Sequence, residues 1–218
     1  MIIAILLASS IMTAPAFAAP SKAAPAKIPS ELLAIEKSYA EAGTLQAQYS
    51  QVTFKAAMNS ESRSSGNLSI KRPDKLKWEQ TQPDTSLTLS DGRTVWFYTP
   101  PFDKDEKGQL IQRKSSQVNS KLANALLSGS FSSNARNMKI ERKSPILFDL
   151  RPKKGTAGSI LRAELEIDPQ AKLIRKVTLF HEGGNRSEIG LSGIKLGEKL
   201  EDSLFKFSPP PNTDIVKE

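Results

Sequence analysis

The sequence predicts a mainly β protein with helices, an α+β fold in which antiparallel strands dominate. Apolar and polar residues alternate over short segments from Leu45 onward, which is the period of a strand with one buried face. The Asp91-Gly92 pair separates two such segments and predicts a hairpin turn. Two other segments repeat apolar residues at helical spacing, and helices among antiparallel strands must bury that stripe against the sheet.

The chain is 218 residues long, with 38% hydrophobic and 25% charged residues, which is typical of a globular protein. Met1 to Leu7 form an apolar run, and Ala16-Phe17-Ala18 has the small-x-small form of a signal-peptidase site. We therefore expect a signal peptide at residues 1–18, cleaved near Ala18, a flexible linker at 19–27 and one domain at 28–218. The apolar run is too short and too interrupted for a membrane anchor, so we expect export without stable membrane insertion.

The ionisable composition excludes several classes of site. The chain has no cysteine, so it forms no disulfide and has no cysteine at its N-terminus for lipid attachment. Its single histidine, His181, disfavours metal centres and Ser-His chemistry, and we expect no metal and no cofactor. The net charge is +8, but no aromatic residues interleave with the basic ones. We expect a solvated basic surface and no nucleic-acid partner.

The first predicted element is a helix over residues 30–42. Leu32, Ile35 and Tyr39 recur at helical spacing, Ser30 is a candidate N-cap, and Gly43 is a natural C-terminal stop. Strands follow, and their alternating apolar residues are Leu45, Ala47 and Tyr49, then Leu68 and Ile70, then Leu76 and Trp78, then Leu87 and Leu89. The Asp91-Gly92 hairpin joins the strand at 87–90 to a strand at 94–99.

A second helix is predicted over residues 117–128, where Val118, Leu122 and Leu126 lie on one stripe. Ser115 or Ser116 would cap its start, and Gly129 would end it. A short extra turn is expected at 132–137. The remaining strands are expected at 138–143, 146–151, 161–167, 173–180, 187–193 and 204–207.

Arg72 is the residue whose position demands an explanation. Strand alternation places Arg72 on the same face as Leu68 and Ile70. A guanidinium cannot be neutralised, so on a half-buried face it needs several hydrogen-bond acceptors. Arg72 therefore either acts as a structural clasp that holds two segments together or takes part directly in the function of the protein. The alternative is an arginine at a strand end that stacks on Trp78 or pairs with a nearby aspartate.

A set of short motifs, spread along the chain, adds a family resemblance. They are Lys71-Arg72-Pro73, Trp78, Gln82-Pro83-Asp84, Ser90-Asp91-Gly92, Trp96-Phe97-Tyr98 and Phe205-Lys206-Phe207-Ser208-Pro209-Pro210. Their order and spacing resemble the LolA family of periplasmic outer-membrane lipoprotein carriers. The resemblance covers essentially the whole exported chain and is strongest over residues 66–100 and at the C-terminus, whereas residues 100–160 match loosely.

The resemblance implies a fold and a role. The fold would be an incomplete, strongly curved antiparallel β-barrel with an α-helical lid, formed by the helices at 30–42 and 117–128, over a hydrophobic cavity. Arg72 matches the family arginine that bonds to the lid backbone and holds it closed. The role would be that of a monomeric periplasmic chaperone that takes acylated lipoproteins from an inner-membrane LolCDE-type ABC transporter and hands them to a LolB-type outer-membrane receptor. No phosphate-binding loop is present in the chain, so ATP would not be its own energy source.

The residues expected to line the acyl-chain cavity are the inward-facing apolar ones, although each of them also suits an ordinary core. They are Leu45, Ala47, Tyr49, Leu68, Ile70, Leu76, Trp78, Leu87, Leu89, Val95 and Phe97, with Leu122 and Leu126 beneath the lid. Trp96 and Tyr98 are expected on the opposite face.

Three other functions compete with the carrier. A LolB-type receptor is itself a lipoprotein, and the absence of cysteine disfavours it. A related envelope regulator that senses lipoproteins or lipid would normally carry a second domain, for which the chain has little room. A periplasmic hydrolase would depend on carboxylates alone, and no pair among them has motif support, so we expect no enzyme. Those carboxylates are Asp84, Asp91, Glu164, Glu166 and Asp168.

Overall fold

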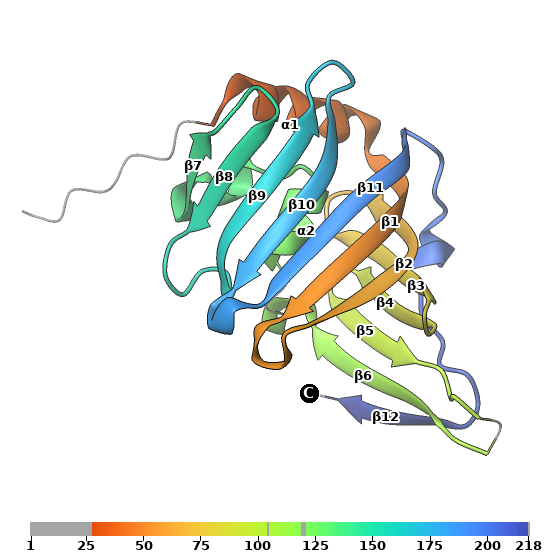
Figure 1. The fold of residues 1–218 in the computed structure, drawn as a ribbon. Coiled ribbons are helices and arrows are strands. Elements are labelled where there is room, and N and C mark those ends of the chain that lie inside the picture. Colours follow the sequence, from red (N-terminus) through yellow and green to blue (C-terminus); the bar gives the residue numbers. More distant parts are fainter. Residues whose placement is uncertain (1–27, 104, 119–120, 218) are drawn as a thin grey trace, which may run out of the picture.

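The computed structural model describes residues 28–103, 105–118 and 121–217, and these residues build one strongly curved sheet of twelve strands (Figure 1). The strand order is β12-β6-β5-β4-β3-β2-β1-β11-β10-β9-β8-β7, and the sheet stays open because its two edge strands, β12 and β7, do not pair with each other. Neighbouring strands are antiparallel except β12 and β6, which are parallel. The expected incomplete antiparallel barrel is confirmed. The signal peptide and linker expected at 1–27 lie outside the described residues.

The strands follow one another along the chain with short connections between most neighbours. Their bounds are β1 Thr44–Lys55, β2 Ser60–Lys71, β3 Lys75–Gln82, β4 Ser86–Asp91, β5 Thr94–Thr99, β6 Gly108–Lys114, β7 Met138–Arg142, β8 Leu147–Pro152, β9 Ile160–Asp168, β10 Leu173–His181, β11 Arg186–Leu196 and β12 Thr213–Lys217. The 3-10 turns are η1 Ala56–Met58, η2 Ser115–Gln117, η3 Ser132–Asn137, η4 Glu182–Gly184 and η5 Asp202–Phe205.

Helix α1 spans Ser30–Ala42, as the sequence predicts, and it lies along one rim of the sheet in Figure 1. The proposed N-cap is wrong: Pro29 precedes the helix, and Ser30 is its first residue, with a hydroxyl that donates to Glu31. Gly43 ends the helix in the left-handed conformation (φ 71°), which glycine adopts without steric cost.

Helix α2 spans Lys121–Leu127 and is shorter than the helix predicted at 117–128. It lies inside the curve of the sheet (Figure 1). The segment Ser115–Gln117 forms the separate 3-10 turn η2, and Val118 is extended, so the helix does not begin at Gln117. Gly129 follows with φ 66° and donates its N–H to the Leu126 carbonyl, which is the predicted helix stop. Within the described residues, no helix is long and apolar enough to cross a membrane.

Three further predictions need correction. The segment at 204–207 is not a strand, because Asp202–Phe205 forms the 3-10 turn η5. Strands β6 and β12 were not expected. Arg72 is not a strand residue: β2 ends at Lys71, and Arg72 opens the turn that leads to β3.

The main hydrophobic core fills the concave side of the sheet. Leu32 and Ile35 of α1 are fully buried there, together with apolar side chains of α2 and of the long strands. Tyr39 is also buried, and its hydroxyl accepts a hydrogen bond from the Ile174 amide in β10 at 3.0 Å. Glu36 accepts hydrogen bonds from the amide and hydroxyl of Ser132, which join α1 to η3. The helical layer is therefore fixed both by apolar packing and by specific polar contacts.

A second apolar cluster lies on the convex side of the sheet, under the segment that follows β11. Phe205 is completely buried against it, and Leu89 and Leu110 are almost completely buried. The Phe207 ring lies 5.3 Å from Tyr98 and 6.4 Å from Trp96, measured between ring centroids. Trp96 and Tyr98 therefore lie on the outer face, as the sequence predicts.

Two lysines hold this C-terminal segment in place. The ammonium groups of Lys71 and Lys75 lie 2.7 and 2.8 Å from the Asp202 carboxylate. Lys71 also donates to the Leu200 carbonyl at 2.8 Å. The hydrogen bonds from Lys71 and Lys75 lower the pKa of Asp202 to about 2. The two ends of the β2–β3 turn thus hold the C-terminal segment on the convex side.

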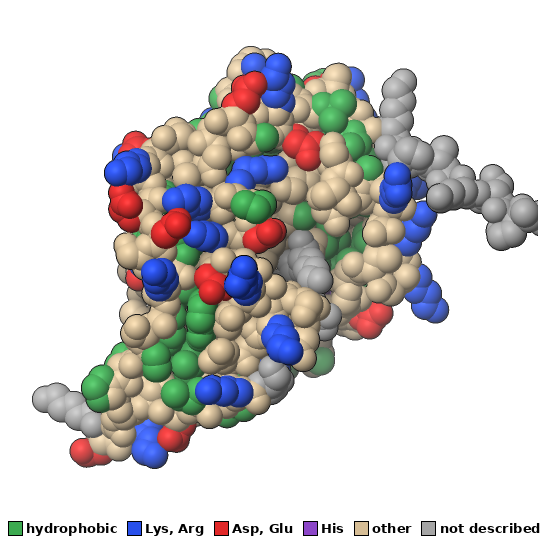
Figure 2. All heavy atoms as spheres, turned by 180° about the vertical axis from the view of Figure 1, so that it is seen from behind, with side chains coloured by type: hydrophobic (Ala, Val, Ile, Leu, Met, Phe, Trp, Pro, Cys, Tyr) green, Lys and Arg blue, Asp and Glu red, His purple; other side chains and the backbone are tan. Residues whose placement is uncertain are grey.

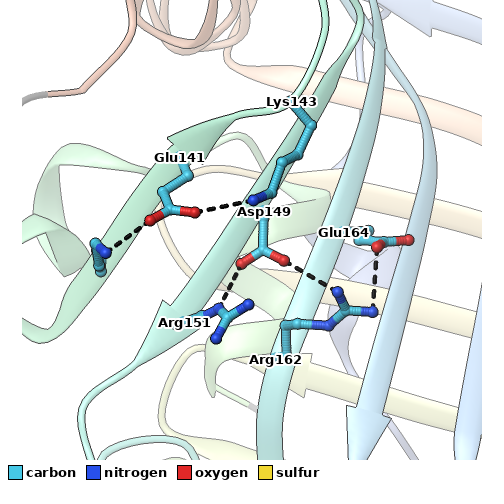
Figure 3. Close-up of polar contacts among 7 residues, drawn as sticks. Glu141, Lys143, Asp149, Arg151, Arg162 and Glu164 are labelled. Atoms are coloured by element: carbon cyan, nitrogen blue, oxygen red, sulfur yellow. Dashed lines mark hydrogen bonds and ion pairs between the residues drawn. The ribbon is translucent and has the colours of Figure 1, made fainter.

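Two groups of ion pairs lie on the outer face of β7, β8 and β9, one around Glu141 and one around Asp149 (Figure 3). The Asp149 carboxylate, 1% exposed, accepts from Arg151 at 2.9 Å and from Arg162 at 3.1 Å. The Arg162 guanidinium also pairs with Glu164 and lies 3.9 Å above the centroid of the Phe180 ring. The buried carboxylate is therefore compensated by two cations, as burial of a charge requires.

Candidate functional site

A cavity of about 850 Å³ lies between the concave face of the sheet and the segments that carry α2 and η3. The sheet contributes residues from β2, β3, β4 and β5, and the opposite wall comes from η2, α2 and η3. This volume is within the range of roughly 300–1,000 Å³ that is usual for small-ligand sites. The cavity is the candidate functional site.

Part of the cavity wall consists of apolar residues that the sequence picks out. These are Ile70, Leu76, Trp78, Val95 and Phe97, and Val118 and Ala125 join them from the helical side. Their shared face follows from the register, which pairs Ile70 with Leu76 directly across β2 and β3.

Other candidate residues take part in the packed core and do not line this cavity. They are Leu45, Ala47, Tyr49, Leu68, Leu122 and Leu126, all nearly buried. The Tyr49 ring lies 4.2 Å from the Trp78 ring, measured between centroids, so the core and the cavity wall are continuous.

Leu87 and Leu89 need a correction, because they face the convex side of the sheet. The register pairs Leu89 with Trp96 and Leu87 with Tyr98, and these two aromatic rings contact Phe207 outside the barrel. The inward positions of β4 are those of Thr88 and Ser90, which line the cavity.

Polar lining residues are the part of the site that sequence reasoning missed. They include Ser90, Ser115, Asn124, Ser128, Ser130, Ser133, Asn134 and Glu36. The run of serine and asparagine from Ser128 to Asn134 follows an apolar helix and could have signalled a polar rim. Only the tertiary structure brings this run opposite the β2–β3 turn.

Arg72 joins this turn to the ends of both helices. Its Nη1 donates to the Ser128 carbonyl at 2.6 Å, directly after α2. Its backbone amide donates to the Gly43 carbonyl at 2.9 Å, directly after α1. Carbonyls at the C-terminal end of a helix carry partial negative charge, so a guanidinium is favoured there. Of the several acceptors that the sequence predicts for Arg72, the structure gives its side chain one, the Ser128 carbonyl that follows α2.

The apolar wall continues beyond the cavity towards the sheet edge. Ile111 in β6 is paired with Phe97 in β5 and with Val216 in β12, so the three side chains share the concave face. Ile111 is 36% exposed and Val216 is 52% exposed. Figure 2 shows hydrophobic side chains gathered in a hollow at the lower left, over the part of the molecule formed by β5, β6 and β12. An elongated apolar ligand could extend along this face.

The carboxylates considered for a hydrolase do not line the cavity. Asp91 accepts from the amides of Arg93 and Thr94 in its turn, and Asp168 accepts from Ala171 and pairs with Arg175. Glu164 and Glu166 pair with basic residues on the outer face, and Asp84 is exposed.

Neither the single histidine nor the acidic residues of the described part of the chain form a catalytic or metal-binding group. His181 is half-buried at the end of β10, where its Nδ1 lies 3.2 Å from the Ser159 hydroxyl, and burial lowers its pKa. Among the described residues, no group of three or more His, Cys, Asp or Glu could hold a metal ion.

A family model and curated relatives both indicate similarity to outer membrane lipoprotein carrier proteins. The family model described as "Outer membrane lipoprotein carrier protein LolA" matches residues 40–208. Outer-membrane lipoprotein carrier proteins from Dechloromonas aromatica and Azotobacter vinelandii are 30% and 28% identical to the chain. These alignments cover 80% and 81% of the chain and 82% and 83% of the relatives.

A solved structure supports the fold independently of sequence. An uncharacterized conserved protein from Thermus thermophilus is similar with a TM-score of 0.52, at 14% identity, over 86% of the chain and 97% of that protein. Since the family model spans most of the sequence and the open curved barrel with its helical layer agrees with it, this chain belongs to the LolA family of outer membrane lipoprotein carrier proteins.

Proposed function

We propose that this protein is a periplasmic chaperone that binds the acyl chains of lipoproteins, carries them across the periplasm and hands them to an outer-membrane receptor. The observation that carries the proposal is the half-apolar cavity of about 850 Å³ beneath a helical layer that Arg72 ties down. The names of its relatives support the same role.

The physical task explains why such a cavity is needed. Each CH₂ group exposed to water costs about 0.8 kcal/mol, so the free acyl chains of a lipoprotein would cost tens of kcal/mol in water. Spontaneous transfer between two membranes is negligible for that reason. A carrier must cover the chains along much of their length, and the apolar face from Trp78 through Phe97 to Ile111 supplies an elongated surface for them.

We further assign Arg72 the role of a latch that holds the lid closed in the empty carrier. The bond from Nη1 to the Ser128 carbonyl links the sheet to α2 at the mouth of the cavity. Entry of a ligand would break this bond, and departure of the ligand would restore it. The empty state is thereby stabilised, which favours release to the receptor.

The proposed partners follow from this role. Cargo arrives from a LolCDE-type ABC transporter of the inner membrane, and a LolB-type receptor takes it at the outer membrane. The chain contains no phosphate-binding loop, so the energy of detachment comes from the transporter. The protein acts as a monomeric carrier and not as an enzyme.

The test is release of newly made lipoproteins from spheroplasts, with a matched pair of variants on adjacent residues of β6. Ile111→Lys places a charge on the concave apolar face, whereas Gln112→Lys places the same charge on the outer face. We expect wild type and Gln112→Lys to release lipoproteins into the medium as soluble complexes, and Ile111→Lys to release much less. Failure of the wild-type protein to release any lipoprotein would contradict the proposed function.

A further inference from the structure

The cavity has a polar end and an apolar end, and strand register fixes their order. The β2–β3 turn and the β4–β5 turn lie at the same end of the sheet, because Lys75 pairs with Asp91. Ser90 donates its hydroxyl to the Asp74 carbonyl at 3.3 Å between these turns. Trp78 and Thr88 pair farther along the same strands, at the apolar end. A ligand with one polar and one apolar end therefore has a defined direction in the cavity.

The lid side of the polar end is a connected hydrogen-bond network. Ser128 and Ser130 hydroxyls lie 3.1 Å apart, and the Ser130 carbonyl accepts from Ser133 and Asn134, both at 3.2 Å. Since Arg72 bonds to the Ser128 carbonyl, the guanidinium joins this network directly. We call these five residues, together with the cavity-lining Asn124 of α2, the polar mouth.

The polar mouth contains hydrogen-bond donors that the empty protein does not use. A guanidinium has five N–H groups. Among the described residues, the Ser128 carbonyl is the acceptor found for the Arg72 side chain, and the other N–H groups have none. The amide side chain of Asn124 makes no hydrogen bond to the described residues either. Arg72 and Asn124 are only partly buried, so water can reach these N–H groups, and a ligand that covers them must bring acceptors or leave them unpaired.

The charges around the mouth restrict what those acceptors are. Glu36 and Asp74 line the same end of the cavity as Arg72 and Lys75. The ammonium group of Lys75 is paired with Asp202 on the convex side, so Glu36 and Asp74 more than offset the charge of Arg72, and a phosphate group would face repulsion as well as attraction. Neutral oxygen acceptors have no such cost.

We propose that the polar mouth recognises the carbonyl oxygens of the ester and amide groups that join acyl chains to a lipidated cysteine, with Arg72 and Asn124 as the donors. This inference rests on the proposed function. It adds which group of the ligand the protein recognises and the direction in which the ligand lies in the cavity. The acyl chains then extend from the mouth past Trp78 and Phe97. Arg72 exchanges the Ser128 carbonyl for a ligand carbonyl when the cavity fills.

The experiment compares two synthetic lipopeptides that differ only in these carbonyls. One carries two palmitoyl chains as glyceryl esters on cysteine, and the other carries two hexadecyl chains as ethers. Binding is followed by the tryptophan fluorescence of a Trp96→Phe background, in which Trp78, which lines the cavity, is the one tryptophan. We expect the ester lipopeptide to bind about tenfold more tightly, equivalent to about 1.4 kcal/mol.

Variants then assign the preference to its donor. Arg72→Met should reduce the ester-to-ether ratio and, combined with Asn124→Ala, should bring it to near one, whereas Arg93→Met, on the exposed β4–β5 turn, should keep it. Loss of the Ser128 bond changes the binding of both lipopeptides equally, so the ratio isolates carbonyl recognition from lid opening. If Arg72→Met does not fold, the ratio in the Trp96→Phe background alone decides.

The outcomes separate this inference from the proposed function. Equal binding of ester and ether lipopeptides by the Trp96→Phe background overturns carbonyl recognition and leaves the carrier function intact. Binding of neither lipopeptide overturns both. Dipalmitoyl phosphatidic acid serves as a third probe: if it binds more tightly than the ester lipopeptide, and only when Arg72 is present, the mouth recognises phosphate and the inference is wrong.

Discussion

The hydroxyl of Tyr39 accepts a hydrogen bond from the buried amide of Ile174 at 3.0 Å and so joins α1 to β10. The amide lies beside an irregularity in the pairing of β9 and β10, where the strand ladder shifts register between Ile174 and Lys176. A side chain of the helical layer thus completes the hydrogen bonding of the sheet. Burial raises the pKa of Tyr39 to about 12, as expected for a phenol held away from water.

Tyr39→Phe should lower the free energy of unfolding by about 1–3 kcal/mol, because the Ile174 amide would be buried without an acceptor. Urea denaturation measures this change. Tyr49→Phe is the matched control, since the Tyr49 hydroxyl is buried and makes no hydrogen bond among the described residues. That control should leave stability nearly unchanged. Equal decreases in the free energy of unfolding of the two variants would show that the hydrogen bond from the Ile174 amide to Tyr39 does not contribute to stability.

Arg72→Leu should take up cargo but release it poorly. The variant loses the bond that stabilises the empty closed state, a charge-assisted bond worth about 1.5–3 kcal/mol. We expect this bond to outweigh any contact of Arg72 with the ligand, because its acceptor lies at a helix C-terminus. The measurement is transfer of a labelled lipoprotein to liposomes that carry the receptor, with Arg93→Leu as control. Normal transfer by Arg72→Leu would exclude the latch.

Asp149→Ala should destabilise the fold by about 3 kcal/mol, because it removes the buried carboxylate that pairs with both Arg151 and Arg162 and leaves the half-buried Arg162 guanidinium with Glu164 as its remaining ion-pair partner. Glu141→Ala removes a carboxylate that pairs with two exposed lysines in the neighbouring group of ion pairs and should change stability little, even though these lysines lower its pKa to about 2 (Figure 3). Thermal and urea unfolding of the two variants provide the comparison. A similar loss in both would mean that burial of Asp149 is irrelevant.

Acid should loosen the C-terminal segment from the sheet below about pH 4. Lys71 and Lys75 lower the pKa of Asp202 from 3.8 to about 2. A lowered pKa in the folded state means that the stabilisation is complete above pH 3.8 and is lost as the pH falls towards 2. Hydrogen exchange over residues 200–207 and Trp96 fluorescence should report the opening.

Asp202→Asn tests the cause of this acid response. The variant should show faster exchange over 200–207 already at pH 7 and a smaller change between pH 4 and pH 2. Glu201→Gln, which removes an exposed carboxylate paired with Lys199, is the control and should behave like the wild type. An unaltered acid response in Asp202→Asn would assign the transition to another group.

The sequence wrongly predicts that Leu87 and Leu89 line the cavity. Strand alternation shows that two residues share a face of the sheet, but not which face it is. Alternation correctly places the two leucines on one face, but the face is set by the length of the β4–β5 loop, which pairs Ser90 with Val95. Both faces of β5 carry large apolar residues, because one faces the cavity and the other faces the C-terminal segment, whereas the apolar residues of β4 face only the C-terminal segment. A local pattern does not distinguish these two apolar surroundings.

The C-terminal region was the least predictable from sequence for a related reason. The segment at 204–207 has strand-like composition, yet Phe205 and Phe207 act as single side chains packed on the outer face of a distant part of the sheet. By contrast, α1 was predicted with its observed bounds, since its stripe and its glycine stop are local signals. Elements fixed by their own residues were predictable, and those fixed by long-range packing were not.

The outer cluster around Phe205 bears on how the cavity can be emptied. Leu89 in β4 and Leu110 in β6 are almost completely buried on the convex side, and Phe97 in β5 and Ile111 in β6 lie on the opposite, concave face of the same part of the sheet. Burial of apolar side chains on the convex face stabilises these strands, whether or not a ligand covers their concave face. A site that must give up its ligand at delivery needs a wall whose stability is independent of that ligand. The convex packing provides this independence, so the proposed carrier function would use a preformed surface for both loading and unloading.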